Sequence, residues 1–130
     1  MNARTFALIF GIVFLAVGIL GFGIVPGLLQ EQTGSGMQAS GMLLGLFHVN
    51  ALHNIIHILF GLWGLVASRS LGGAVGYFKA VAVIYALLAI LGLIAATATG
   101  FGYVMLGGYN VYLHAALAVV AAIIGFVKKG

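Results

Sequence analysis

Four long apolar blocks constrain this chain more than any other feature of its sequence. Each block is close to the roughly 20 apolar residues that an α-helix needs to cross the ~30 Å hydrocarbon core of a bilayer. We place the four helices at about residues 6–25, 42–66, 77–97 and 111–127, with a polar loop over residues 26–41. The sequence therefore predicts an all-α fold, a single membrane domain over residues 1–130 that forms a four-transmembrane-helix bundle.

The composition agrees with a membrane protein. Hydrophobic residues make up 64% of the chain and charged residues 5%, against roughly 25% charged residues in soluble domains. Because the chain has no cysteine, thiolate nucleophiles, iron–sulfur clusters and cysteine-based zinc sites are excluded. A net charge of +4 would favour nucleic acid as the partner of a soluble protein. Here the cations are scattered at predicted helix ends, so we expect the lipid bilayer as partner and no nucleic acid.

The charged residues orient the four helices. All five cations fall on one side of a four-crossing topology: Arg4, Arg69, Lys79, Lys128 and Lys129. The only acid, Glu31, falls on the other side. Cytoplasmic segments carry an excess of Lys and Arg, so both termini are predicted to be cytoplasmic. We also expect Trp63, Tyr77 and Phe78 to lie in the interfacial aromatic belt on the cytoplasmic side.

Polar residues of the second predicted helix share one face. At ~100° per residue, Asn50, His53, Asn54 and His57 fall within an arc of roughly 100°. Polar side chains are costly in hydrocarbon and face the bundle interior. The other helices add polar groups at comparable depth, so we predict an inner polar network of seven residues: Asn50, His53, Asn54, His57, Tyr85, Asn110 and His114.

Small residues continue two of these faces. Gly61 and Gly64 extend the polar face of the second helix, and a matching strip of the fourth helix holds His114, Ala118, Ala121 and Gly125. Counted from the cytoplasmic helix ends, His53 and His114 lie at the same depth and could meet. The same count places Tyr85 near His57, which predicts a hydrogen bond between the tyrosine hydroxyl and the imidazole.

Several motifs resemble one known family. They are Gly11–Gly21 running on to Pro26-Gly27, Leu43–Phe47, Leu52–Gly61 with its Leu-His-Asn-x-x-His-x-x-x-Gly run, Val83–Tyr85, Gly92-Leu93 and Leu113-His114. Over nearly the whole chain they resemble the bacterial family catalogued as domain of unknown function 4383. The resemblance implies a four-helix integral membrane protein without an assigned activity, and we expect it in the bacterial cytoplasmic (inner) membrane.

The chain departs from that family at the start of the last helix. The family usually carries an Asp-Asn-aromatic-Leu-His run there, whereas this chain reads Asn110-Val-Tyr-Leu-His114. An amide replaces the acid. A role that needs a carboxylate at this point, such as divalent metal binding or proton relay, is therefore not expected here.

The sequence favours a non-enzymatic function. It shows no nucleophile–base–orienter set and no acid in any predicted helix, and it offers small residues for helix contacts: Gly11, Gly18, Ala82, Ala86, Ala89 and Gly92. We expect an accessory subunit or scaffold of a larger membrane assembly, or a homo-oligomer. Transport is disfavoured because four helices leave little room for an alternating-access cavity and no proline breaks a span.

Cofactor binding is the alternative. His53, His57 and His114 could hold haem b or a chlorin-like pigment between the second and fourth helices, because two imidazoles at one level suit axial ligation. A metal ion held by His53 and His57 alone would have an incomplete ligand set for zinc. We therefore predict no metal site.

Overall fold

The computed structural model describes residues 2–33, 40–94 and 109–128. In chain order its elements are α1 (Ala3–Leu20), β1 (Leu29–Thr33), β2 (Ser40–Leu43), β3 (Phe47–Asn50), α2 (Ala51–Ala67), α3 (Leu71–Leu93), α4 (Tyr109–Ala122) and a π-helical segment, η3 (Ile123–Lys128), which continues α4. The fold is mostly helical with one small sheet, so the all-α prediction is correct except for the strands. Three helical runs are long and apolar enough to cross a membrane: α1, α3 and α4 with η3. α2 is a shorter apolar helix of 17 residues.

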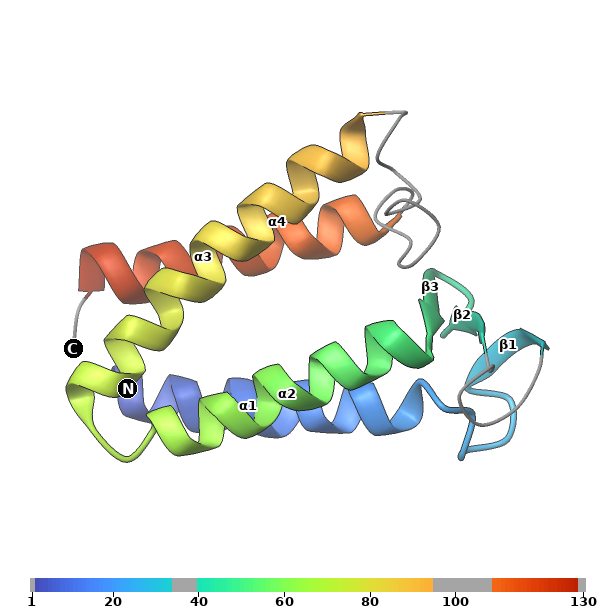
Figure 1. Cartoon of the computed structure of the whole chain (residues 1–130), viewed down its shortest axis with the longest axis horizontal. Coiled ribbons are helices and arrows are strands. Elements are labelled where there is room, and N and C mark those ends of the chain that lie inside the picture. Colours follow the sequence, from blue (N-terminus) through green and yellow to red (C-terminus); the bar gives the residue numbers. More distant parts are fainter. Residues whose placement is uncertain (1, 34–39, 95–108, 129–130) are drawn as a thin grey trace.

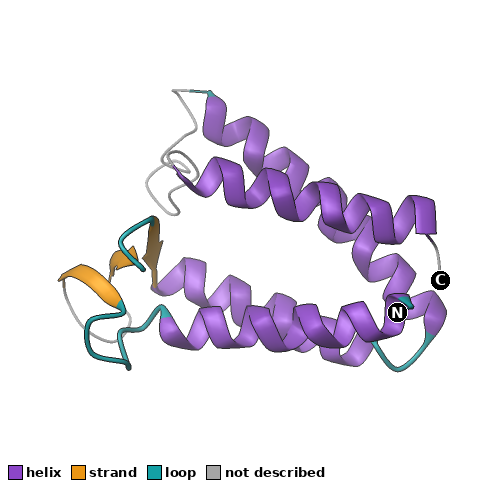
Figure 2. Ribbon diagram, turned by 180° about the vertical axis from the view of Figure 1, so that it is seen from behind, coloured by secondary structure: helices purple, strands orange, loops and turns teal. Residues whose placement is uncertain are grey.

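The helices pack as two antiparallel pairs, α1 with α2 and α3 with α4 (Figure 1). The two pairs face each other, as the view from behind also shows (Figure 2). They approach most closely at the end that holds the start of α1, the turn between α2 and α3, and the end of η3. The strands lie at the opposite end of α1 and α2. Both ends of the described chain therefore lie at the same end of the helices.

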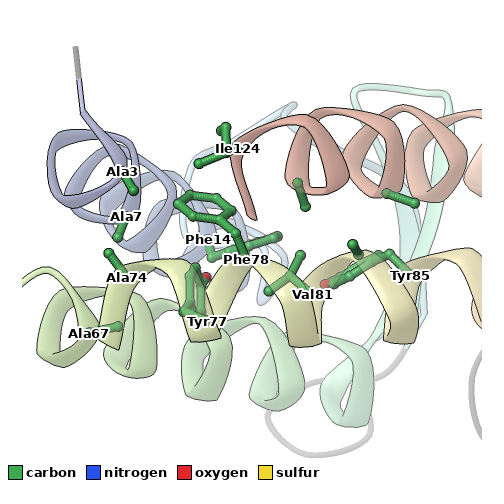
Figure 3. Packing of buried hydrophobic residues seen from close by; sticks show 13 residues of the cluster. Ala3, Ala7, Phe14, Ala67, Ala74, Tyr77, Phe78, Val81, Tyr85 and Ile124 are labelled. Atoms are coloured by element: carbon green, nitrogen blue, oxygen red, sulfur yellow. The ribbon is translucent and has the colours of Figure 1, made fainter. Parts of the chain in front are cut away.

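Small and aromatic side chains from all four helices form the core near the close end (Figure 3). Tyr77 and Phe78 are 1% and 0% exposed, so the predicted interfacial belt is wrong for these two residues. They belong to the core because α3 turns this face toward the other helix pair. The Tyr77 hydroxyl donates a hydrogen bond to the Phe60 carbonyl oxygen at 3.0 Å, which satisfies its polar group. Trp63 is 41% exposed, and its ring lies 5.0 Å from that of Tyr77.

The largest difference from the predicted helices concerns residues 42–50. They form strands, and α2 begins only at Ala51. Leu44 and Gly45 have φ angles of 57° and 72°, which turn the chain between β2 and β3 and are incompatible with a continuous helix. Asn50 then starts α2, because its side chain accepts a hydrogen bond from the His53 backbone N–H at 2.9 Å.

The three strands form an antiparallel sheet in the order β1-β2-β3. Part of the predicted loop over residues 26–41 is therefore strand, since β1 and the start of β2 fall within it; residues 34–39 lie outside the described part. Leu29, Leu43 and Val49 form a small apolar cluster that packs against Val17 and Leu20 at the end of α1. A short apolar run that packs in this way cannot be told from a buried helix by hydropathy alone.

The other helix limits shift by a few residues. α1 ends at Leu20 instead of residue 25, because Gly21 caps it and Gly23 adopts a φ of 78°. α3 begins at Leu71 instead of residue 77, where the Ser70 side chain accepts a hydrogen bond from Gly73 N–H at 3.0 Å. Its described helix ends at Leu93, and residues 95–97 of the predicted span lie outside the described residues. The predicted helix at 111–127 is α4 followed by η3.

Candidate functional site

The predicted polar face of α2 is buried inside the protein. The exposed fractions of His53, Asn54 and His57 are 5%, 0% and 3%, and Gly61 and Gly64 on the same face are buried as well. The sequence places these groups on one side because residues three and four apart share a helix face. Asn50 caps the helix and is half-buried.

The matching strip of α4 is also buried. Asn110 and His114 are each 1% exposed, and Ala118 and Ala121 follow on the same face. The Asn110 amide donates a hydrogen bond to the backbone carbonyl of His48 at 3.1 Å, which joins the start of α4 to β3. His48 therefore belongs to the sheet and contributes its main chain to this contact.

Glycines allow α1 to approach the polar helix closely. A Cβ atom at Gly61 would lie 2.7 Å from the backbone nitrogen of Leu15 and 2.8 Å from the Gly11 carbonyl oxygen. A Cβ at Gly18 would lie 2.7 Å from the Asn54 carbonyl oxygen. The two backbones are therefore in contact along this face, as small residues permit in membrane helix pairs.

A chain of ring contacts joins the histidines and connects all four helices. The His53 and His57 rings stack at 4.2 Å on α2, and His57 meets Phe14 of α1 edge-on at 5.4 Å. Phe14 stacks on Tyr85 of α3 at 5.8 Å, and Tyr85 lies 5.3 Å from His114 of α4. We call these five residues and Asn54 the inner cluster. Figure 3 shows Phe14 and Tyr85 among the packed side chains of the core.

Hydrogen bonding fixes only part of the inner cluster. His57 Nδ1 lies 3.0 Å from the His53 carbonyl oxygen. Because a carbonyl only accepts, Nδ1 carries the proton and Nε2 is left as an acceptor. The predicted hydrogen bond between Tyr85 and His57 is not formed: the tyrosine ring instead packs against Phe14 and His114.

Several buried polar atoms of the inner cluster have no hydrogen-bond partner among the described residues. They are both ring nitrogens of His53, both amide atoms of Asn54, and Nδ1 of His114. The Asn54 amide lies directly against Gly21, where any larger residue would collide with it. Most buried polar groups in proteins are paired, so unpaired ones concentrated at one place mark a candidate binding site.

The inner cluster contains no Asp, Glu, Lys or Arg side chain. Arg4, Arg69, Lys128 and Glu31 are exposed. Lys79 is half-buried, with its Nζ 5.5 Å from the centre of the Phe126 ring. In the described parts of the chain, no three His, Asp or Glu side chains come together as a metal site. The arrangement therefore offers neutral hydrogen-bond donors and acceptors in an aromatic surrounding.

Sequence reasoning missed two members of this site. Phe14 was not a candidate because it looks like any other apolar residue of the first block. Its spacing from Ala7, Gly11 and Gly18 could have indicated it, since these residues share the buried face of α1. Gly21 was read as part of a helix, whereas it ends α1 and makes room for the Asn54 amide.

The chain is therefore a small helical protein with buried, uncharged polar side chains. Three of its helical runs have the length and composition that crossing a membrane requires. The chain matches the family described as domain of unknown function (DUF4383) over residues 4–127 and belongs to that family. The resemblance found in its sequence motifs is thus confirmed. No curated protein and no solved structure matches the chain.

Proposed function

We propose that this chain is an integral protein of the bacterial cytoplasmic membrane that crosses the bilayer four times with both termini in the cytoplasm. The supporting observation is the outer surface, where each helix exposes large apolar side chains. Ile12 of α1, Leu59 of α2, Val83 of α3 and Val119 of α4 are 54%, 58%, 62% and 59% exposed. Apolar surface on all sides is unfavourable in water and matches acyl chains.

The charges near the helix ends agree with this orientation. Lys79 lies inside α3, because that helix begins at Leu71, and Lys129 lies outside the described residues. Arg4, Arg69 and Lys128 lie near the end shared by the start of α1 and the end of η3, and Glu31 lies in the sheet at the other end. α2 measures ~25 Å at 1.5 Å per residue, slightly less than the ~30 Å hydrocarbon core. The sheet before it would then lie at the outer interface, where its strands pair with each other.

Cysteine labelling tests the topology directly, because the natural chain has no cysteine. Thr33→Cys on β1 and Gly72→Cys at the start of α3 change exposed positions at opposite ends of the fold. The reagent is a membrane-impermeant maleimide, added to intact cells or, where an outer membrane is present, to spheroplasts. It should label Thr33→Cys before lysis and Gly72→Cys only after lysis. Labelling of both sites before lysis in sealed spheroplasts would refute the four-crossing arrangement.

Within that membrane, we propose a non-enzymatic role as an accessory subunit or scaffold of a larger assembly. The small residues of α1 and α2 are used inside the protein, so they do not form an outer association face. A partner would therefore contact the large apolar side chains outside. Among the small residues considered above, Ala86 is exposed and Ala82, Ala89 and Gly92 are buried.

Native mass spectrometry of the protein released in polymer-bounded native membrane discs tests this role. The proposal expects a particle with a fixed number of copies of this chain, either with a second protein in constant stoichiometry or as a defined homo-oligomer. A single copy surrounded only by lipid, in discs prepared at several polymer ratios, would overturn it.

A haem b or chlorin-like pigment held by the histidines is the second candidate. It is favoured by the hydrogen bond between His57 Nδ1 and the His53 carbonyl, because histidines that bind metal commonly donate their other N–H in this way. The histidine of α4 that would serve as the second ligand is His114, which is buried. An absorbance spectrum of natively purified protein tests it, since absence of a Soret or chlorin band after purification would remove this candidate.

A further inference from the structure

The unpaired polar atoms of the inner cluster come from three side chains on two helices. His53 and Asn54 of α2 and His114 of α4 are 5%, 0% and 1% exposed, and five of their nitrogen and oxygen atoms lack a partner among the described residues. A buried donor or acceptor without a partner is unfavourable, because it has lost its hydrogen bonds to water and gained none in return. The folded protein is therefore expected to place a hydrogen-bonding molecule against them.

The chemistry of these groups limits what that molecule is. A neutral imidazole presents one donor and one acceptor and exchanges them by changing tautomer, and the asparagine amide presents both kinds of group. The site can thus donate to carbonyl oxygens and accept from hydroxyl groups. A ligand whose oxygen atoms alternate between carbonyl and hydroxyl forms would find hydrogen-bond partners here in either form.

The unpaired atoms lie among aromatic rings. Phe14 and Tyr85 are nearly parallel, at 15° and 5.8 Å, and His53 and His57 stack at 26° and 4.2 Å. Because the rings of each pair stack on one another, a flat ligand would meet their outer faces and edges. Aromatic side chains stack favourably with other planar rings. All four helices contribute to this neighbourhood, so a planar group held here would touch both helix pairs.

Charge at this end of the fold favours an uncharged ligand over haem. His53 and His114 lie in the first two turns of α2 and α4, toward the strand end. The charged side chain described at that end is the acidic Glu31 on β1, while Arg4 and Arg69 lie at the other end. The two carboxylates of haem b would therefore meet an acid there instead of a base.

We propose that the inner cluster binds the headgroup of a membrane quinone, with His53, Asn54 and His114 hydrogen-bonding its oxygens and its isoprenoid tail extending into lipid. The inference rests on the proposed membrane location, because such a molecule reaches the site only from the bilayer. It concerns binding of the quinone and quinol forms and assigns no electron transfer to the protein. It is compatible with the accessory role, since a bound quinone can be presented to a partner.

Quinone content and ligand-dependent stability test the proposal. Solvent extracts of natively purified protein should give the borohydride difference spectrum of a quinone, close to one per chain. Protein depleted of lipid should rise in Tm with decylubiquinone (a benzoquinone) or menadione (a naphthoquinone), in proportion to the logarithm of ligand concentration. The better of the two probes identifies the ring class.

Variants locate the binding site. His53→Phe and Asn54→Leu should each raise the Kd for the better probe about tenfold or more, as loss of a buried hydrogen bond implies. If an α2 variant does not fold, His114→Phe tests the same site from α4. Tyr112→Phe, which removes a polar group from a side chain that is 72% exposed, is the matched control and should leave the Kd unchanged.

The outcomes of these experiments distinguish a failure of quinone binding from a failure of the proposed membrane topology. Extracts without quinone, together with no Tm response of the wild-type protein to either probe, would overturn quinone binding and indicate that water alone fills the site. A haem spectrum that disappears in His114→Phe would overturn it as well. Neither outcome affects the cysteine-labelling test of the four-crossing topology.

Discussion

Replacing Gly61 by alanine should separate α1 from α2 and lower stability. The added Cβ would lie 2.7 Å from the Leu15 backbone nitrogen and 2.8 Å from the Gly11 carbonyl oxygen. Both are main-chain atoms, so a change of side-chain rotamer cannot relieve the contact. The whole of α1 must move outward, which also disturbs the contact between Phe14 and His57.

The magnitude follows from two opposing effects. Alanine is preferred over glycine in a helix by about 0.8–1 kcal/mol. Overpacking in a close interface costs about 1–3 kcal/mol, so the net loss at Gly61 should be up to about 2 kcal/mol. Gly76→Ala is the matched control, because Gly76 lies in α3 and a Cβ there would meet nothing within 4 Å. That variant should be as stable as the wild type or slightly more stable.

Reversible unfolding in mixed micelles by titration with sodium dodecyl sulfate, followed by far-ultraviolet circular dichroism, measures both free energies. Because the gain in helix propensity is common to both, the two alanine variants should differ by the overpacking cost, about 1–3 kcal/mol. If Gly61→Ala proves as stable as Gly76→Ala, the close backbone packing of α1 on α2 is wrong.

Three further substitutions are testable in the same unfolding assay. His57→Leu should leave membrane insertion intact and lower bundle stability by about 1 kcal/mol, because it removes the hydrogen bond to the His53 carbonyl; unchanged stability would argue against a structural role. Tyr77→Phe should cost about 0.6–1.5 kcal/mol through loss of its bond to Phe60, with unaltered far-ultraviolet dichroism of the folded protein. Asn50→Ala should cost about 1 kcal/mol, whereas Asn50→Asp, which keeps a capping oxygen, should retain most of the stability.

The sequence predicts well those features that depend on neighbouring residues along one helix. The face carrying His53, Asn54 and His57 is buried in the structure, because a period of 3.6 residues turns positions three and four apart to one side. Hydropathy was less informative about where a helix begins. Residues 42–50 are as apolar as a helix would be, yet Leu44 and Gly45 make a turn and Asn50 is a helix cap.

The sequence alone determined that the chain forms long apolar helices, and that the amide and imidazole groups of α2 and α4 turn toward the protein interior. These properties follow from composition and local periodicity. The tertiary structure decided that α1 packs on α2 and α3 on α4, that Phe14 joins the histidines to Tyr85, and that His53 and Asn54 keep unpaired polar atoms. Such features arise from contacts between segments far apart in the chain, and the pattern within one segment does not specify its neighbour.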